Sequence, residues 1–188
     1  ESLRRDGYRI IVTMDPEIQK LAYEAFREDD YFPGNVEGVE GAFVLMDEET
    51  GAIRSAIGGR SYKRGDLNRV HVQRQPGSTM KPIAVYGPAM MSEQYHPYSL
   101  IKDEQVDYDG YVATNVNGLY AGSVSMFDAL VYSKNAPAVW LLDQIGIDYA
   151  KTYLELMNID LSDQGLAIAL GGLEKGISPL QMAEAYRT

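Results

Sequence analysis

Two pairs of polar residues in this chain have the side chains and the spacing that nucleophilic catalysis requires. Ser78 and Lys81 form a Ser-x-x-Lys, and residues three apart on a helix share a face, so the amine can reach the hydroxyl. A serine needs an adjacent base to become a nucleophile, and a lysine acts as that base only if its pKa falls from about 10.4 towards roughly 7–8. Ser133 and Asn135 form a Ser-x-Asn further along the chain. A second hydroxyl there can relay a proton to a leaving amine, and the carboxamide can hold a peptide carbonyl or the lysine.

The chain around Ser78 predicts a helix that carries this residue at its start. Gln75-Pro76-Gly77 is a turn sequence, and a mostly apolar segment follows it. We expect Ser78 to cap that helix, which would leave free backbone N–H groups near a reacting carbonyl. Gly87-Pro88 within the segment predicts a kink.

The second pair lies at a predicted break between two helices. Ser125 opens a short helix over 126–132 with a capping box, and the chain from Ser133 to Asn135 interrupts it. The residue between the pair, Lys134, is interpreted as a solvent-facing spacer. Further helices are predicted from Pro137, over 148–157 and from Ser178.

The first part of the chain predicts mixed structure. Tyr8 to Thr13 indicates a short strand, Asp15 caps a helix, and the apolar runs over 41–46 and 52–57 indicate a β-hairpin. Residues 95–121 are expected to be irregular, with short strands. We expect residues 1–14 to be a linker and entry strand, and residues 15–188 to form the N-terminal and helical part of one domain.

Other candidate sites have structural interpretations. A second Ser-x-x-Lys, Ser99 to Lys102, has no apolar helix behind it and is interpreted as a solvated loop. The acidic stretch from Asp103 to Asp109 lacks the spacing of an EF-hand and is interpreted in the same way. His71 and His96 lack a paired metal-ligand spacing, so no metal site is predicted.

Composition narrows the classes of function. The chain has 188 residues, with 17 Lys and Arg against 27 Asp and Glu, and a net charge of −10. This balance argues against nucleic acid as a partner, because a phosphate backbone needs a basic surface. The absence of cysteine excludes disulfides and thiol catalysis. No apolar run approaches the length of about 18 residues that a transmembrane helix needs.

The order Ser-x-x-Lys, then Ser-x-Asn, resembles the signature of penicillin-binding proteins and serine β-lactamases. The flanking sequences are similar to the transpeptidase domain of class A, bifunctional penicillin-binding proteins. The similar stretches, which together span nearly the whole chain, are Met14 to Gln19, Gly58 to Tyr62, Asn68-Arg69, Arg74 to Ser78, Ala169 to Gly172 and Gly176 to Ala183. The third motif of that family, Lys-Thr/Ser-Gly, is missing from these residues. We therefore expect the chain to be a piece of a longer protein, with the C-terminal strands of the domain following it.

The resemblance implies an α+β, β-lactamase/transpeptidase-like fold with an antiparallel sheet, flanking helices and a helical subdomain, incomplete in this chain. It implies a D,D-transpeptidase that cross-links peptidoglycan stem peptides and is acylated by β-lactams. In that reaction Ser78 would be the nucleophile and Lys81 would take its proton. Ser133 would pass a proton to the leaving nitrogen, and Asn135 would orient the substrate and the lysine. No cofactor or metal would be needed.

Two alternatives stay open from the sequence. One is a serine β-lactamase or D,D-carboxypeptidase, although no deacylating carboxylate is identified. The other is a β-lactam sensor or scaffold that is acylated without turnover. The resemblance also implies an upstream glycosyltransferase domain, an N-terminal membrane anchor and a place on the extracytoplasmic face of the bacterial cell membrane.

Overall fold

A computed structural model describes residues 5, 7–32 and 38–187 of the chain. The chain divides into two compact units, the first formed by residues 1–72 with Arg187 and the second by residues 73–186. The domain limit that the sequence suggests after residue 14 stays a prediction. All four candidate catalytic residues lie in the second unit.

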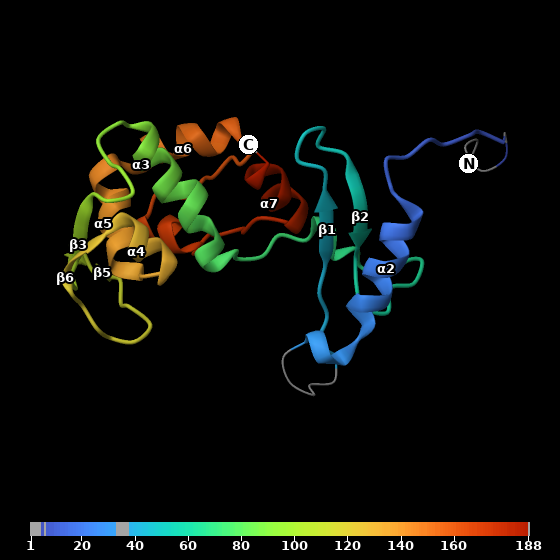
Figure 1. Ribbon diagram of the computed structural model, residues 1–188, viewed down its shortest axis with the longest axis horizontal. Helices are drawn as coiled ribbons and strands as arrows, with labels where there is room; N and C mark the ends of the chain where they lie inside the picture. Colours follow the sequence, from blue (N-terminus) through green and yellow to red (C-terminus); the bar gives the residue numbers. More distant parts are fainter. Residues whose placement is uncertain (1–4, 6, 33–37, 188) are drawn as a thin grey trace. The chain divides into compact units, whose positions relative to one another are not determined.

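The first unit pairs one helix with a β-hairpin (Figure 1). Helix α2, Pro16–Arg27, begins where the Asp15 carboxylate accepts hydrogen bonds from two backbone amides of the first turn, at 2.9 and 3.0 Å. Strands β1, Phe43–Met46, and β2, Ile53–Ile57, pair antiparallel, as the hairpin prediction required. Two 3₁₀ turns, η1 at Asp29–Tyr31 and η2 at Arg69–His71, complete the unit.

The predicted strand from Tyr8 to Thr13 does not form. The chain there is extended and its apolar side chains are exposed, with Ile11 at 83%. It approaches β2 only at its end, where the Thr13 hydroxyl donates to the carbonyl of Ile53 at 2.9 Å. A strand needs a continuous partner for its backbone groups, and local β-propensity does not supply one.

The second unit consists of helices with two small antiparallel sheets (Figure 1). Its helical elements are η3 (Gly77–Thr79), η4 (Pro82–Tyr86), α3 (Gly87–Met91), α4 (Met126–Val131), α5 (Asn135–Ile145), α6 (Ile147–Leu156), η5 (Leu166–Leu170) and α7 (Pro179–Tyr186). Its strands are β3 (Leu100–Asp103), β4 (Asp107–Tyr108), β5 (Tyr111–Val112) and β6 (Gly122–Ser125). Strand β3 pairs with β6, and β4 pairs with β5. The α+β class predicted from the sequence is confirmed.

Helix α5 is the centre of this unit. Val139, Leu141 and Leu142 are fully buried, and the helix packs against β3, η4 and η5. Burial of each such side chain contributes roughly 1.5–3 kcal/mol. A helix buried on most of its faces holds its first residue in place, and that residue is Asn135.

The helical segment that starts at Gly77 changes type along its length. It is 3₁₀ over η3, π-helical over η4 and α-helical over α3. The Gly87 amide donates to the carbonyl of Pro82, five residues earlier, just before Pro88 removes a backbone donor. The interruption expected at Gly87-Pro88 therefore takes the form of a π-helical segment.

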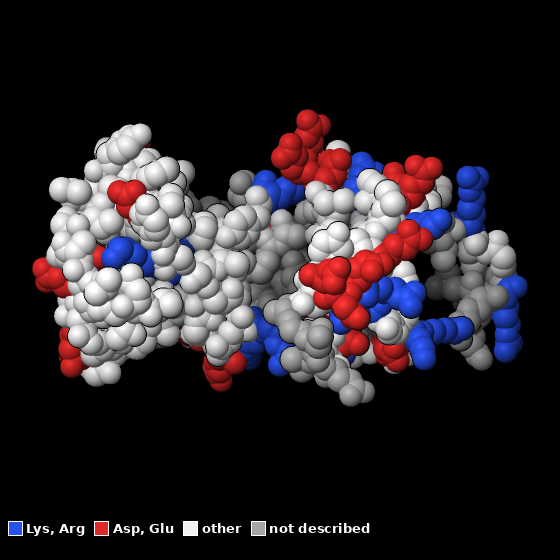
Figure 2. All heavy atoms as spheres, turned by 60° about the horizontal axis from the view of Figure 1, so that its bottom comes forward, with Lys and Arg blue, Asp and Glu red and all other residues white. Residues whose placement is uncertain are grey.

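The surface of the second unit is mostly uncharged on the face shown in Figure 2, at the left of the view. The first unit carries side chains of both signs. Within the part of the chain that the structure describes, no helix is both long enough and apolar enough to cross a membrane.

Candidate active site

Lys81 is the centre of a polar cluster inside the second unit. Only 1% of the residue is exposed. Its ammonium donates to the backbone carbonyl of Ser133 at 2.6 Å, to the Ser133 hydroxyl at 3.1 Å and to the Asn135 side-chain oxygen at 2.7 Å. The structure thus brings three of the four predicted residues into direct contact.

Burial also changes the protonation of this lysine. Desolvation of the ammonium lowers the pKa of Lys81 from 10.5 to about 8. At neutral pH an appreciable fraction of the amine is therefore free of its proton. A side chain in this state can take a proton from a neighbouring hydroxyl, as a general base must.

Ser78, the fourth residue, stands one helical turn before Lys81 and is exposed. It does not cap the helix, contrary to the prediction, because the cap position is Pro76 and Ser78 already lies inside the 3₁₀ turn. The turn begins one residue earlier, at Gly77, whose backbone is left-handed with a φ of +59°. Within the described residues the Ser78 hydroxyl makes no hydrogen bond, which leaves it available to a ligand.

The turn that carries Ser78 is held from the C-terminal part of the second unit. The Tyr186 hydroxyl donates to the carbonyl of Thr79 at 2.7 Å. Arg74 and Ile177 exchange two backbone hydrogen bonds of 3.1 and 2.8 Å. Gly171 packs against Gly77, and a Cβ on Gly171 would stand only 2.4 Å from the Gly77 carbonyl oxygen. This close approach of two backbone segments explains why position 171 holds a glycine.

The turn between α4 and α5 carries the other two residues. Ser133 has a φ of +49°, a left-handed conformation that is uncommon for a non-glycine residue. Such backbone costs about 1–3 kcal/mol and persists only where the surroundings impose it. The Ser133 and Lys134 amides bind carbonyls of α4, those of Leu130 and Ala129, at 3.0 and 2.9 Å.

Asn115 anchors the same turn from a loop earlier in the chain. Its side-chain oxygen accepts hydrogen bonds from the first two amides of α5, those of Asn135 and Ala136, at 2.9 and 3.0 Å. It therefore caps this helix, because the N-cap residue itself, Lys134, makes no capping hydrogen bond with its side chain. The side-chain nitrogen of Asn135 donates to the carbonyl of Thr114 at 2.8 Å. The side-chain oxygen of Asn135 is thereby directed to Lys81.

Two interpretations from the sequence are wrong here. Lys134 is not a solvent-facing spacer, because its side chain is 17% exposed and its ammonium contacts the carboxylate of Asp103 at 2.5 Å. Asp103 is not part of a solvated loop, because it is fully buried at the end of β3. Burial acts to raise the pKa of Asp103, but the hydrogen bonds from Lys134, Ala121 and Asn115 and the lysine charge lower it overall.

The alternation of β3 could have revealed Asp103. Ile101 and Asp103 are two residues apart, so on a strand they share a face, and both are buried. The same strand holds the end of the second Ser-x-x-Lys, so the prediction of a loop for that stretch is wrong as well. Ser99 precedes the strand and accepts a hydrogen bond from the His96 amide, while Lys102 pairs with Glu104.

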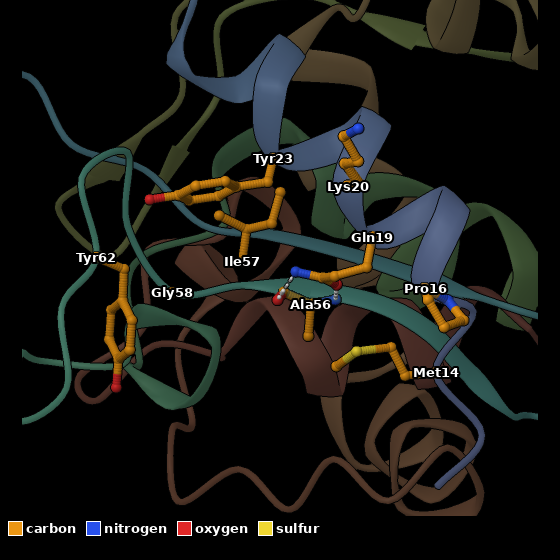
Figure 3. A pocket seen from close by; sticks show the side chains of 9 residues that line it. All are labelled: Met14, Pro16, Gln19, Lys20, Tyr23, Ala56, Ile57, Gly58 and Tyr62. Atoms are coloured by element: carbon orange, nitrogen blue, oxygen red, sulfur yellow. Dashed lines mark hydrogen bonds between the residues drawn. The ribbon is translucent and has the colours of Figure 1, made fainter.

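A cavity of about 550 Å³ lies within the first unit. Figure 3 shows the Gln19 side chain reaching from α2 to the backbone of Ala56 on β2, with hydrogen bonds of 3.1 and 2.9 Å. The cavity is lined by Met14, Pro16, Gln19, Lys20, Tyr23, Ala56, Ile57, Gly58 and Tyr62, none of them a candidate catalytic residue. Over the described residues, no group of three or more His, Asp or Glu side chains is placed to hold a metal ion.

An α+β frame that joins a Ser-x-x-Lys helix to a Ser-x-Asn turn defines the β-lactamase/transpeptidase-like class of fold. Residues 41–188 match the family model described as the penicillin binding protein transpeptidase domain. The chain belongs to this family, and the resemblance inferred from its sequence is confirmed.

Two relatives and one solved structure illustrate the similarity. Penicillin-binding protein 1F of Bacillus subtilis (strain 168) is 51% identical over 188 residues, covering 100% of this chain and 26% of the relative. Penicillin-binding protein 4 of the same strain is 31% identical over 191 residues, covering 100% and 30%. The chain thus spans less than a third of either relative. The PonA1 protein of Mycobacterium tuberculosis, solved in complex with penicillin V, superposes with a TM-score of 0.84 at 22% identity, over 100% of this chain and 52% of that one.

Proposed function

We propose that this chain carries the acylation site of a D,D-transpeptidase that cross-links peptidoglycan stem peptides. The observation that supports this most is Lys81, buried with a lowered pKa and bonded to both members of the Ser-x-Asn pair. Membership of the transpeptidase family adds support. The structurally similar PonA1 protein was solved in complex with penicillin V, which supports β-lactams as ligands of this site.

Each candidate residue has a role in the proposed reaction. The Ser78 oxygen attacks the carbonyl of the penultimate D-alanine, and the neutral Lys81 amine takes its proton. The C–N bond breaks as a proton passes through the Ser133 hydroxyl to the leaving nitrogen, which releases D-alanine. An amine of a neighbouring stem peptide then attacks the acyl ester, which frees the serine and forms the cross-link. Asn135 holds the lysine and orients the peptide.

The setting of the whole protein is part of the proposal. We expect an upstream glycosyltransferase domain, a membrane anchor and the C-terminal remainder of the domain in the full protein. The site would then face its cell-wall substrate on the extracytoplasmic side of the bacterial membrane. Peptidoglycan stem peptides and β-lactams are its proposed ligands.

The test is intact-protein mass spectrometry of the full-length protein that contains this chain, after incubation with a penicillin. We expect one covalent adduct, which is lost in Ser78→Ala. The matched control is Ser99→Ala, since this serine also begins a Ser-x-x-Lys but precedes a strand. Circular dichroism establishes that both variants are folded. An adduct that survives in folded Ser78→Ala, or a wild-type chain that forms none, contradicts the proposal.

A further inference from the structure

An ion pair lies beneath the turn that carries Ser133 and Asn135. The Lys134 ammonium contacts one oxygen of the Asp103 carboxylate, and Asp103 is fully buried. The sequence places this lysine between the two members of the Ser-x-Asn pair. The pair of charges therefore fixes the middle residue of the turn to the end of β3.

Asp103 holds the turn by a second route as well. Its other oxygen accepts a hydrogen bond of 2.7 Å from the side-chain nitrogen of Asn115, which is itself 4% exposed. The Asn115 oxygen in turn accepts the amides of Asn135 and Ala136. One carboxylate thus reaches the turn through a lysine on one side and through an asparagine on the other.

We propose that Asp103 is a positioning residue for acylation, acting through Lys134 and Asn115 to hold Ser133 and Asn135 against Lys81. The inference deepens the proposed function and rests on it. The left-handed backbone of Ser133 needs such support, because a turn free to relax would leave this conformation. Relaxation would withdraw the Ser133 carbonyl and the Asn135 oxygen, the acceptors of the two shortest Lys81 bonds.

Three variants of the full native chain separate positioning from simple stability. Asp103→Asn and Lys134→Met each leave one buried charge without its partner, so both should lower the thermal midpoint. The double variant Asp103→Asn/Lys134→Met leaves no unpaired charge, so its midpoint should recover. The matched control is Glu104→Gln. It also removes one carboxylate, but Glu104 is half-exposed and pairs with the half-exposed Lys102.

The readout is the reaction with a fluorescent penicillin, resolved into the dissociation constant of the first complex and the acylation rate constant. We expect the rate constant to fall about 10- to 100-fold in the double variant, since misplaced catalytic groups carry losses of this size. The dissociation constant should stay within about twofold of wild type, and Glu104→Gln should match wild type in both. A rate constant that recovers together with the thermal midpoint overturns the positioning role.

A second readout does not depend on turnover. The side-chain NMR signal of Lys81 in protein labelled with ¹³C-lysine, assigned by its loss in Lys81→Arg, reports the surroundings of the amine. We expect its chemical shift and titration midpoint to change in the double variant and to stay unchanged in Glu104→Gln. An unchanged chemical shift and titration midpoint in the double variant overturn the positioning role, whether or not wild type forms a penicillin adduct. The absence of an adduct in wild type is a separate result, and it would overturn the proposed function.

Discussion

The protonation of Lys81 gives the sharpest prediction for this protein. Its pKa of about 8, lowered by burial from 10.5, means that about one amine in ten is neutral at pH 7. At the unperturbed pKa only about one in three thousand would be neutral. Burial thus enlarges the population of the proposed base by a factor of roughly 300.

The acylation rate should follow this population. We expect the rate constant for penicillin acylation to rise nearly tenfold from pH 6 to pH 7 and to level off above pH 8. Lys81→Arg should lower it by about 10²–10⁴, because a guanidinium stays protonated over this range. The assay is stopped-flow fluorescence with a reporter penicillin on the full native chain, and circular dichroism at each pH establishes that the protein is folded.

The outcomes that contradict this reasoning are specific. A rate constant that does not change between pH 6 and pH 8 would mean that no group with the lowered pKa limits acylation. A rise that continues to pH 10 would mean that burial does not shift the lysine. A Lys81→Arg protein with the wild-type rate would remove Lys81 from the reaction.

Three further predictions concern packing and stability. Gly171→Ala should lower the thermal midpoint more than Gly146→Ala and should slow acylation. Both glycines have a positive φ, but only a Cβ at position 171 would lie within 3 Å of other backbone, that of Gly77. Equal thermal midpoints and unchanged acylation would contradict the role of this contact. Leu142→Ala should lower the free energy of unfolding by about 2–5 kcal/mol, and the exposed Leu156→Ala by no more than about 0.5 kcal/mol, both measured by urea unfolding. Between pH 8 and pH 10 the folded chain binds fewer protons at Lys81 than the unfolded chain, so stability should rise with pH in this window, and Lys81→Met should flatten that rise.

The elements that local chemistry specifies could be predicted from the sequence. Asp15 begins α2, Ser125 begins α4 and Ser178 precedes α7, each with side-chain bonds to the first turn, as the capping patterns indicated. The sequence also indicates the break after α4, although α5 begins at Asn135 and not at Pro137. Capping involves residues within a few positions of one another, and for this reason it is readable along the chain.

The alternation of β3 indicates that Asp103 is buried, but the partners that support the site could not be predicted, because they are distant in the sequence. Asp103 and Lys134 are 31 positions apart, and each is of a residue type that is usually found at the surface. Asn115 caps a helix that begins 20 positions later, which no capping pattern describes. The predicted strand at Tyr8 to Thr13 is wrong for the opposite reason, since its local propensity is sufficient but no strand of the described residues pairs with it.

The shortest bond of Lys81, at 2.6 Å, is accepted by the carbonyl of Ser133 and not by a side chain. A codon change at position 133 alters the hydroxyl and leaves this carbonyl in the chain. No substitution at position 133 therefore removes the acceptor of this bond. Where Lys81 is kept, variation can still disturb the contact by moving the peptide plane, including through the residues that hold the turn from a distance. Sequencing confined to the two short motifs would overlook such changes, and the codons for residues 103 and 115 belong in the same survey.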